Sequence, residues 1–470
     1  MTHVHLVGIG GAGLSAIARV LLERGETVTG SDRTLSALAQ AVRDAGARVY
    51  IGHKAENIAG ADYVVRSSAI TDDNVEIQAA LSKGIPVLKR AGFMPYLMRG
   101  QKCVAVAGTH GKTTTTAMIA WMLTATGQDP SFIVGSPVAN LDRNARAGNG
   151  SIFVIEADEY DRMFHGLEAD IAVVTNIEHD HPDCYPTEAD FRQAFLEFAR
   201  RLRDDGVLLT CMEDQGARSL HEWMAQNGKR ALTYGLNHGM GNAGADFISR
   251  DLQTNQQGGF DFEFISRLTS NQGGKKAVRV SLQVVGRHNV LNATAALAVT
   301  DLLHLPLAEA AAALAEFRGT ARRFEIRGEV QGVIVIDDYA HHPTEIRTTL
   351  AAARGRYPNR EIWAVWQPHT YSRTRVLFAE FAQAFTQADH VVVLDVYAAR
   401  EAPPTDGFSS REIARAIQHT DAHYHPGLLH SPAWLIERLQ PGSLLLVLSA
   451  GDADQLSGGV LSGLRERLKN

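Results

Sequence analysis

Cysteine is scarce in this chain of 470 residues, which contains only three, at positions 103, 184 and 211. Their spacing matches no metal-binding pattern, and so few cysteines cannot form a disulfide framework. A protein that needs neither cysteine-bound metal nor disulfides is typical of a reducing compartment. We therefore predict a cytoplasmic location.

Excess charge of one sign and long apolar runs are also missing. The chain has 46 Lys and Arg against 52 Asp and Glu, a formal net charge of −6 at pH 7. Nucleic-acid-binding proteins usually show a basic excess, so we expect no nucleic-acid partner. No stretch approaches the ~20 apolar residues that cross a bilayer, so we expect no membrane insertion. The uncharged start of the chain lacks a basic n-region, and glycines interrupt it, which argues against a signal peptide.

What the chain has is enough apolar material for several cores, since hydrophobic residues make up 45% of it. At roughly 150 residues per domain, the length predicts about three domains. Apolar β-branched runs alternate with helical patterns, which is typical of α/β folds with parallel sheets. We predict a Rossmann-like N-terminal domain over 1–99, a central ATPase-type P-loop domain over 100–321 and a C-terminal Rossmann-like domain over 322–470.

The most informative stretch is 103–118, which reads CVAVAGTHGKTTTTAM. A buried strand over 104–107 turns through glycines into a helix. Backbone N–H groups and the helix N-terminus at such a turn attract phosphate, Lys112 adds a positive charge, and the Thr113 hydroxyl can ligate Mg²⁺. The longer GxxxxGK[ST] pattern is not met. A glycine turn without a ligand is therefore the alternative, but a lysine and consecutive threonines would add nothing to it.

A second glycine turn lies near the N-terminus. A strand over 4–9 runs into GIGGAG at 8–13, and a helical pattern follows. The next strand ends at Asp32, about twenty residues after the glycines, as in a Rossmann βαβ unit. Glycines in such a unit hold a diphosphate, and the acidic residue reaches a ribose or base. The pattern alone fits NAD and other diphosphate nucleotides equally.

Polar clusters follow two strands of the central domain. The strand at 151–155 ends in EADEYD at 156–161, and the strand at 171–175 ends in NIEHDH at 176–181. Parallel sheets bind ligands at the carboxyl ends of their strands, and an acidic residue there is the usual partner of Mg²⁺ in P-loop domains. The alternatives are a solvated acidic turn and a His-rich loop. Two clusters in one P-loop domain favour the metal.

The remaining segments predict further strands and helices. The polar stretch 246–283 indicates a peripheral antiparallel hairpin or meander, and an Ala-rich helix follows from residue 286. In the last domain we expect strands at 333–337, 362–366, 390–396 and 443–448, with a long amphipathic helix after residue 373. Three of these strands end in ionisable residues, which is the layout of a site at a sheet's carboxyl edge.

Together these motifs resemble those of the Mur ligase family, the ATP-dependent enzymes that build the peptide stem of bacterial peptidoglycan. The resemblance covers essentially the whole chain. It rests on an ordered set of motifs, namely GIGGAGLS at 8–15, GSD at 30–32, IGH at 51–53, SSAI at 67–70, GTHGKT at 108–113, HN at 288–289, DDYAHHP at 337–343 and QPHTYSR at 367–373.

The resemblance implies an ATP-dependent carboxylate–amine ligase. It would join L-alanine to the carboxylate of UDP-N-acetylmuramate through an acyl phosphate, in cytoplasmic peptidoglycan precursor synthesis. The expected partners are these two small molecules and ATP, with Mg²⁺ as cofactor. A monomer or a weak homodimer is expected.

The resemblance also implies which residues hold each ligand. The residues expected to bind the UDP-substrate are Gly8, Gly10, Gly11, Ala12, Gly13, Asp32, His53 and Ser68. Those expected to bind ATP are Gly108, Thr109, His110, Gly111, Lys112, Thr113, Thr114, Asn289, Asn292, Arg322 and Asp337. Those expected to bind Mg²⁺ are Thr113, Glu156 and His181, and those expected to bind the amino acid are Tyr339, His341 and Arg373. Lys112, His341 and Arg373 would be catalytic.

Three features depart from the family pattern. Tyr160 stands where many alanine-adding members have Ser, a version that resembles the murein-peptide ligases, which reattach a tripeptide. Ser136 stands where a second glycine is common. No lysine occurs between His181 and Arg203, so the carbamylated lysine of other branches has no candidate, in agreement with the alanine-adding branch.

Three other functions are kept as alternatives. The first is the tripeptide-adding ligase, which only the segment around Tyr160 favours. The second is a non-catalytic nucleotide-binding protein that retains the fold, which the intact Lys112 and Thr113 argue against. The third is an NAD-dependent oxidoreductase, which rests on GxGxxG alone.

Overall fold

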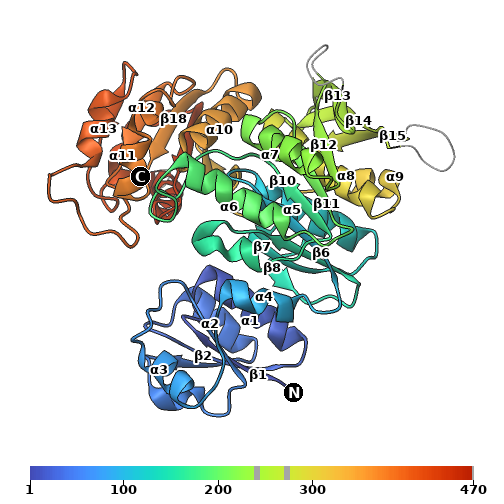
Figure 1. Ribbon diagram of the computed structural model, residues 1–470. Helices are drawn as coiled ribbons and strands as arrows, with labels where there is room; N and C mark the ends of the chain where they lie inside the picture. Colours follow the sequence, from blue (N-terminus) through green and yellow to red (C-terminus); the bar gives the residue numbers. More distant parts are fainter. Residues whose placement is uncertain (238–243, 269–275, 468–470) are drawn as a thin grey trace.

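The computed structural model describes residues 1–237, 244–268 and 276–467. Three β-sheets follow one another along the chain, and helices cover each of them (Figure 1). We call the parts built on these sheets the N-terminal, central and C-terminal domains. The predicted three-domain α/β class is confirmed. Within the described residues, no helix combines the length and the apolar character needed to cross a membrane.

The N-terminal sheet is fully parallel, with strand order β3-β2-β1-β4-β5. The order reverses between β1 and β4, and ligands of such sheets bind outside the carboxyl ends at that point. The glycine turn after β1 lies there. The elements are β1 (His3–Val7), α1 (Ala12–Glu23), β2 (Thr27–Asp32), α2 (Ala37–Asp44), β3 (Arg48–Ile51), η1 (Ala55–Ile58), β4 (Tyr63–Arg66), α3 (Val75–Ser82), β5 (Val87–Lys89) and α4 (Arg90–Leu97).

The central sheet has β6 near its middle, paired in parallel with β9 and β10. The core side chains of β6 are fully buried because helices cover both faces, which explains its unbroken apolar run. Its first elements are β6 (Lys102–Ala107), α5 (Lys112–Ala125), β7 (Ser131–Val138), β8 (Arg143–Arg146), β9 (Ile152–Glu156), η2 (Tyr160–Gly166), β10 (Ile171–Val174), α6 (Glu188–Arg200), β11 (Val207–Cys211), α7 (Gln215–Gln226) and β12 (Ala231–Leu236).

The stretch 246–283 forms the antiparallel meander that we predicted, although 269–275 lie outside the described residues. The meander extends the central sheet through a parallel pairing of β12 with β13. Its strands and the helices that follow are β13 (Phe247–Thr254), β14 (Phe260–Ser266), β15 (Lys276–Leu282), α8 (Arg287–Leu302) and α9 (Leu307–Ala315).

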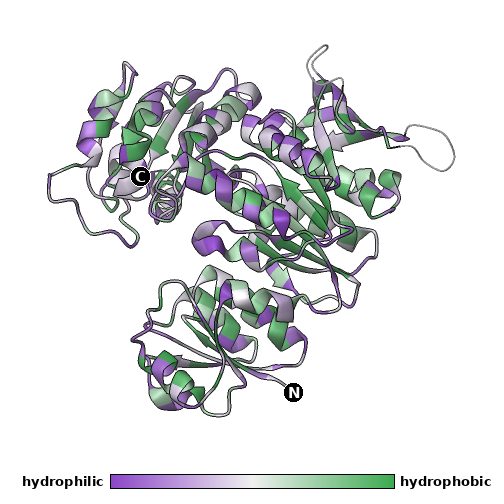
Figure 2. Cartoon of the chain, viewed as in Figure 1, coloured by the Kyte–Doolittle hydropathy of each residue, from purple (hydrophilic) through white to green (hydrophobic). Residues whose placement is uncertain are grey.

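The C-terminal sheet has the order β16-β17-β21-β18-β19-β20, and only its edge strand β16 is antiparallel. Hydrophobic residues are concentrated in the strands, whereas the helices alternate between hydrophobic and hydrophilic residues (Figure 2). The elements are β16 (Glu325–Val330), β17 (Val333–Asp338), α10 (Pro343–Arg356), β18 (Glu361–Trp366), α11 (Tyr371–Val376), α12 (Phe378–Ala382), β19 (His390–Val393), α13 (Ser410–Ala416), β20 (Ala422–Tyr424), α14 (Ser431–Ile436), β21 (Ser443–Leu448) and α15 (Asp454–Arg467).

The prediction of one long helix beyond β18 is wrong. The segment forms the two short helices α11 and α12, which are separated at Leu377, where φ is −103° and ψ is 23°. After this break Phe381 packs against Trp366, with ring centroids 4.5 Å apart. Packing of this buried aromatic pair against the sheet overrides the helical pattern.

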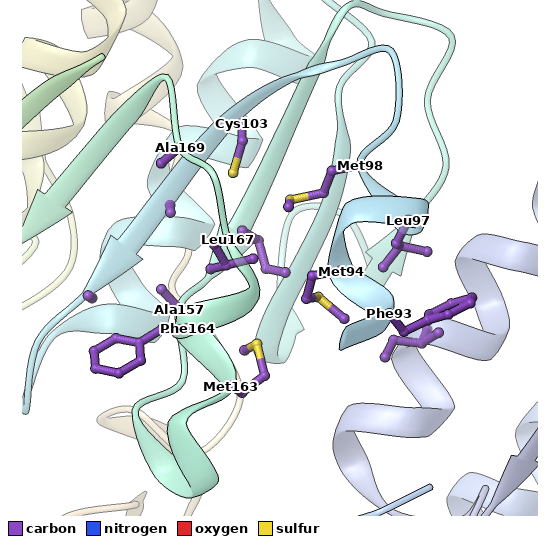
Figure 3. Close-up of a cluster of buried hydrophobic side chains, with 14 of the residues drawn as sticks. Phe93, Met94, Leu97, Met98, Cys103, Ala157, Met163, Phe164, Leu167 and Ala169 are labelled. Atoms are coloured by element: carbon purple, nitrogen blue, oxygen red, sulfur yellow. The ribbon is translucent and has the colours of Figure 1, made fainter. Parts of the chain in front are cut away.

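The N-terminal and central domains share a hydrophobic cluster (Figure 3). Phe93 and Leu97 of α4 are fully buried in it. Met163 and Phe164 of η2, in the central domain, belong to the same cluster. The domain boundary that we placed after residue 99 therefore follows a helix that packs against both domains.

Candidate active site

The turn from β6 to α5 requires glycine at two positions. Gly108 has a φ of +139° and Gly111 a φ of +81°. Residues other than glycine rarely adopt such backbone angles. A Cβ on Gly108 would lie 1.9 Å from Oγ1 of Thr175, and one on Gly111 would lie 2.7 Å from Oδ1 of Asn292. The glycines thus allow the loop to pack closely before α5 begins at Lys112. This is the geometry of an anion-binding helix N-terminus.

Lys112 lies in this loop and is largely buried. Its Nζ donates to the carbonyls of Gly108 and Thr109 and to Oε1 of Glu159, which is 2.9 Å away. Burial acts to lower the pKa of Lys112, but the negative charges of Glu159 and Glu156 outweigh it and raise the pKa. The ammonium group therefore stays charged, as a phosphate contact requires.

Thr113 and Glu156 form an oxygen pair beside the lysine. Oγ1 of Thr113 donates to Oε1 of Glu156 over 3.0 Å, and the backbone N–H of Gly135 donates to the other carboxylate oxygen over 2.6 Å. Burial raises the pKa of Glu156, and Lys112 opposes the shift. A divalent cation at this carboxylate would stabilise its charged form.

Glu159 is the residue in this region that the sequence analysis missed as a site residue. Its Oε1 lies 2.9 Å from Lys112 Nζ and 3.3 Å from Nε2 of His181, so it connects two predicted site residues. Its side chain is 2% exposed, and its Oε2 has no hydrogen-bond partner among the described residues. Burial acts to raise the pKa of Glu159, but Lys112 and His181 outweigh it and lower the pKa.

A cavity of about 820 Å³ lies between the central and C-terminal domains, beside the P-loop. His110, Gly111 and Thr114 line it on the loop side, together with Asn289 and Asn292 of α8. Five of the eleven residues predicted for ATP thus line the cavity. The volume falls within the 300–1,000 Å³ range of ligand pockets.

Arg322, which we predicted for ATP, is absent from the described residues that line this cavity. Its Nη2 donates instead to the carbonyls of Ser449, at 2.7 Å, and Gly451, at 3.1 Å. The next residue, Arg323, does line the cavity and lies 3.4 Å from Oε1 of Glu345. Arg322 thus holds the loop after β21, and Arg323 faces the cavity.

Asp337, also predicted for ATP, is likewise absent from the described residues that line the cavity. Its Oδ1 accepts a hydrogen bond from Ser457 on α15, on the side of β17 away from the cavity lining. Asp338 lines the cavity and accepts from the backbone N–H of Phe324 over 2.7 Å. Side chains alternate between the two faces of a strand, so only one of two adjacent aspartates can face the cavity.

A second cavity, of about 170 Å³, lies between the N-terminal and central domains. Ala12 and Gly13 of α1 line it, and so does Glu156. Arg90 also lines it, and a Cβ on Gly13 would lie 2.7 Å from Arg90 Nη1. Nη2 of Arg90 lies 3.0 Å from Oδ2 of Asp158. A guanidinium beside a glycine turn suits a diphosphate, and the sequence analysis missed it.

The glycine turn of the N-terminal domain is held by Asp32. Oδ2 of Asp32 accepts from the N–H of Gly10 over 2.9 Å, and Gly8 has a φ of +87°. The residues predicted for the UDP-substrate thus share one end of the sheet. Ser68 belongs to the turn after β4. The residue before it, Ser67, lies close to the glycine turn, since its Cβ is 3.0 Å from the position that a Cβ on Gly8 would take.

His53 is oriented by a buried carboxylate. Its Nδ1 lies 3.0 Å from Oε2 of Glu76, which is fully buried. Burial acts to raise the pKa of Glu76, but hydrogen bonds from His5, Ser31, Asn57 and His53 outweigh it and lower the pKa to about 2. The carboxylate is therefore charged at neutral pH and fixes the orientation of the imidazole.

Replacing Glu76 with glutamine should remove an acid-sensitive part of the stability. Because folding lowers this pKa from 4.5 to about 2, the stabilisation is complete above pH 4.5 and is lost as the pH falls toward 2. Glu76→Gln should be less stable than the parent at neutral pH, and the difference should shrink in that window. Urea unfolding at several pH values measures it. Equal pH dependence of Glu76→Gln, the parent and the exposed control Glu56→Gln would contradict this assignment.

Asp180 gathers the residues predicted for the amino acid and the metal. Its Oδ1 accepts from Nε of Arg373 over 2.7 Å, and both side chains are 4% exposed. Its Oδ2 lies 3.7 Å from Nε2 of His181 and 4.0 Å from Nε2 of His341. Burial acts to raise the pKa of Asp180, but Arg373 and the imidazoles hold it well below its ordinary value. Tyr339 joins the group through His341, with ring centroids 5.4 Å apart.

Known sequences and structures settle the family. The profile of the Mur ligase family catalytic domain matches residues 3–102, that of the Mur ligase middle domain matches 106–300, and that of the Mur ligase glutamate ligase domain matches 322–451. The chain belongs to the Mur ligase family. The predicted resemblance is therefore confirmed.

Individual relatives within the Mur ligase family match nearly end to end. The UDP-N-acetylmuramate–L-alanine ligase of Roseiflexus sp. (strain RS-1) is 42% identical over 476 residues, which are 99% of this chain and 100% of the relative. That of Renibacterium salmoninarum is 43% identical over 461 residues, or 98% and 96% of the two chains. The solved structure of UDP-N-acetylmuramate–alanine ligase from Thermotoga maritima has a TM-score of 0.80 and 28% identity, and the match covers 99% of this chain and 100% of that one.

A murein peptide ligase from Psychrobacter arcticus shares the Mur ligase fold, with a TM-score of 0.71, 24% identity and 99% coverage of both chains. Tyr160, the departure that resembles such ligases, lies beside the site. Its ring centroid is 5.2 Å from that of His181, and its hydroxyl donates to Asp183 over 2.9 Å. Arg400 of the C-terminal domain donates to the same hydroxyl over 3.2 Å. Tyr160 thus forms a contact between the central and C-terminal domains at the rim of the site.

Proposed function

We propose that this protein is an ATP-dependent ligase that joins L-alanine to the carboxylate of UDP-N-acetylmuramate. The observation that carries the proposal is the convergence of two cavities on the P-loop. One begins at the N-terminal glycine turn and includes Glu156, and the other lies between the central and C-terminal domains and includes Gly111. A third group of side chains, around Asp180, faces the same loop through His181 and Glu159.

This layout suits a reaction of three substrates. A carboxylate is a poor acyl donor at neutral pH because oxide would have to leave. Its oxygen therefore attacks the γ-phosphorus of ATP, the bond to ADP breaks, and an acyl phosphate forms. The amine of L-alanine then attacks the acyl carbon, phosphate leaves with the C–O bond electrons, and an amide results after loss of the amine proton. Positioning and charge neutralisation supply most of the catalysis in such a transfer.

Lys112 is proposed to neutralise charge on the transferring phosphoryl group. It projects from the N-terminus of α5 and is held by loop carbonyls and Glu159. The backbone N–H groups of the loop and the helix dipole add to its effect. Asn289, Asn292, Arg323 and Asp338 are proposed to hold the rest of the nucleotide, because all four line the larger cavity.

Mg²⁺ is the cofactor that we propose, and the residues present fit it. Thr113 and Glu156 offer oxygen ligands, which Mg²⁺ prefers, and Glu159 has a buried carboxylate oxygen without a partner among the described residues. His181 would complete the set beside Glu159. When bound, Mg²⁺ would supply positive charge between the phosphate oxygens.

Arg373 and His341 are proposed to receive L-alanine. Nε of Arg373 is paired with Asp180 and Nη1 with His369, so Nη2, whose contact with Nδ1 of His181 is long at 3.4 Å, is the part of the guanidinium proposed to hold the amino acid's carboxylate. His341 lies beside the same aspartate and could accept the amine proton. Asp180 is proposed to position both side chains.

The proposed cellular location and oligomeric state belong to the same proposal. Nucleotide-linked substrates and ATP are available in the cytoplasm, where we propose that the reaction occurs. We expect a monomer or a weak homodimer, which sedimentation at several protein concentrations would test.

An amine-specificity assay tests the proposed function. The protein is incubated with ATP, Mg²⁺ and UDP-N-acetylmuramate, together with L-alanine, glycine, L-serine or a murein tripeptide. Phosphate release with formation of the alanyl product is expected for L-alanine. Turnover with the tripeptide and none with L-alanine would favour the murein-peptide alternative, for which Tyr160 is the only signal. Calorimetry that shows binding of NAD but not of UDP-N-acetylmuramate would favour the oxidoreductase alternative.

A pair of adjacent substitutions tests the assignment of the ATP cavity. Asp338→Asn removes a charge from the cavity and should weaken ATP binding by about 10- to 10²-fold, since hydrogen bonds to charged groups contribute ~1.5–3 kcal/mol. Asp337→Asn, on the opposite face of the strand, should change ATP binding little. Titration calorimetry with ATP measures both. A larger loss of ATP affinity in Asp337→Asn than in Asp338→Asn would indicate that Asp337 binds the nucleotide.

A further inference from the structure

Two histidines and a glutamate meet between the central and C-terminal domains. His110 lies in the P-loop, Glu178 follows β10, and His342 caps the N-terminus of α10. Nε2 of His110 is 2.9 Å from Oε2 of Glu178, and Nδ1 of His342 is 3.9 Å from the same oxygen. One ligand atom from each residue lies within 4.8 Å of the others. The proposed function uses neither Glu178 nor His342.

The surroundings of this trio have the form of an outer coordination shell. Oε1 of Glu345 lies 3.2 Å from Nδ1 of His110, and Oγ1 of Thr344 donates to Oε1 of Glu178 over 2.7 Å. In metal sites, a ligating imidazole commonly gives its second N–H to a carboxylate, and a ligating carboxylate is itself hydrogen bonded. Glu345 faces Nδ1 of His110 without a hydrogen bond to it, so Nε2 is the nitrogen turned toward Glu178, and Thr344 leaves one oxygen of Glu178 for a ligand.

His342 supplies an independent observation. Its side chain is 2% exposed, and its Nε2 has no hydrogen-bond partner among the described residues. Buried polar groups are nearly always paired, because an unpaired one loses its hydration without compensation. The imidazole lies against that of His110, with ring centroids 4.7 Å apart. The other ring nitrogen, Nδ1, accepts the backbone N–H of Thr344 over 3.3 Å, so a small cation would engage the unpartnered Nε2 after rotation of the ring.

We propose that His110, Glu178 and His342 form a binding site for Zn²⁺, distinct from the proposed Mg²⁺ site at Thr113 and Glu156. Two imidazoles and one carboxylate are ligands that Zn²⁺ prefers, whereas three of the four residues of the proposed Mg²⁺ site offer oxygen, the ligand that Mg²⁺ prefers. With bonds of 2.0–2.1 Å, tetrahedral ligand atoms are ~3.3 Å apart, and the separations of 2.9 and 3.9 Å lie on either side of that value. Zn²⁺ would take the place of the proton that His110 shares with Glu178, and water would be the fourth ligand.

The site would connect two domains. His110 and Glu178 belong to the central domain and His342 to the C-terminal domain, so the bound ion would fasten the P-loop to the start of α10. Stabilisation by such a ligand grows with its concentration, because the ion binds the folded, closed arrangement. Zn²⁺ should therefore raise the melting temperature of the protein.

Titration calorimetry of the full chain with Zn²⁺, in excess Mg²⁺, tests the proposal. One tight site is expected in the parent protein. Glu178→Gln, which preserves the side-chain volume, and His342→Asn, which is smaller but can still cap α10, should each weaken it by at least ~10²-fold, since loss of an outer-shell partner alone costs 10–100-fold. Circular dichroism of each variant shows whether it folds.

Two control variants separate this site from other places where Zn²⁺ could bind. His181→Asn removes a residue of the proposed Mg²⁺ site, and Asp421→Asn removes the exposed carboxylate that contacts His390 and His423. Both should retain the tight Zn²⁺ site. Loss of Zn²⁺ binding in either control, with retention in Glu178→Gln and His342→Asn, would overturn the proposal.

Co²⁺ gives a second readout that does not depend on the enzymatic activity of the protein. In place of Zn²⁺ it should show the intense visible absorption of a four-coordinate ion in the parent protein, and His342→Asn should lose this spectrum. A weak six-coordinate spectrum in the parent, or no binding of either ion, would also overturn the proposal.

Discussion

Replacing Lys112 with alanine should lower the rate of ligation by at least ~10²–10³-fold, the usual cost of one electrostatic contact to a transition state. Lys112 carries the positive charge at the N-terminus of α5, and its pKa is raised by Glu159 and Glu156, so that it stays charged when buried. Without it, the buried carboxylates of Glu159 and Glu156 lose the ammonium group that offsets their charge beside the proposed position of the γ-phosphoryl group. The rate of phosphate release at saturating substrates measures the effect.

The loss must be separated from a loss of folding. Glu159 is 2% exposed and its pair with Lys112 is broken in the variant, so some stability should be lost as well. Thermal unfolding gives the temperature range in which the variant remains folded, and rates are compared there. Lys102→Ala, an exposed lysine at the start of β6, is the matched control and should retain full activity. Near-normal turnover by folded Lys112→Ala would refute its assignment.

Arg373→Lys should raise the KM for L-alanine by about 10- to 10²-fold, because hydrogen bonds between charged groups contribute ~1.5–3 kcal/mol. The guanidinium can pair with Asp180 through Nε and with His369 through Nη1 and still present Nη2 to a carboxylate. A lysine has a single ammonium group and cannot do both. The KM for ATP should change little, since only the contact to the amino acid is weakened.

The same helix provides the control. Arg375 also lies in α11, but it is 40% exposed and pairs with Asp406. Arg375→Lys should leave the KM for every substrate unchanged. If Arg373→Lys binds L-alanine as the parent does, Arg373 serves only the ion pair with Asp180, and the amino acid must be held elsewhere.

The parts of this site whose position can be inferred from the sequence are local. The P-loop places Lys112 and Thr113 through contiguous residues, because the glycine turn and the start of α5 are fixed by their own sequence. Glu156 was predicted from the rule that polar residues at the ends of parallel strands face a ligand. Its contact with Thr113 then follows, since β9 pairs with the strand that leads into the loop.

The sequence did not decide between adjacent residues of like type. We chose Arg322 and Asp337, whereas the structure turns Arg323 and Asp338 toward the larger cavity. Strand β17 is buried on both faces, so hydrophobic alternation gives no sign of which aspartate faces which side. Arg322 has a left-handed φ of +56°, and the turn of the chain there also sets which arginine points inward.

Residues that act through distant partners were missed for another reason. Asp180 was visible within NIEHDH, but its partner Arg373 lies 193 positions later in the sequence. Arg90 follows a short strand and carries no motif, yet it reaches Gly13 and Asp158. Such contacts depend on how whole domains pack, which no local pattern records.

Transfer of ¹⁸O tests the central claim most directly. UDP-N-acetylmuramate labelled with ¹⁸O in its carboxylate is incubated with the protein, ATP, Mg²⁺ and L-alanine, and the released phosphate is examined by mass spectrometry. An acyl phosphate that L-alanine attacks must leave one carboxylate oxygen in the phosphate, so each turnover should yield singly labelled phosphate and the alanyl product. Unlabelled phosphate, or labelled phosphate that forms with a murein tripeptide and not with L-alanine, would contradict the account.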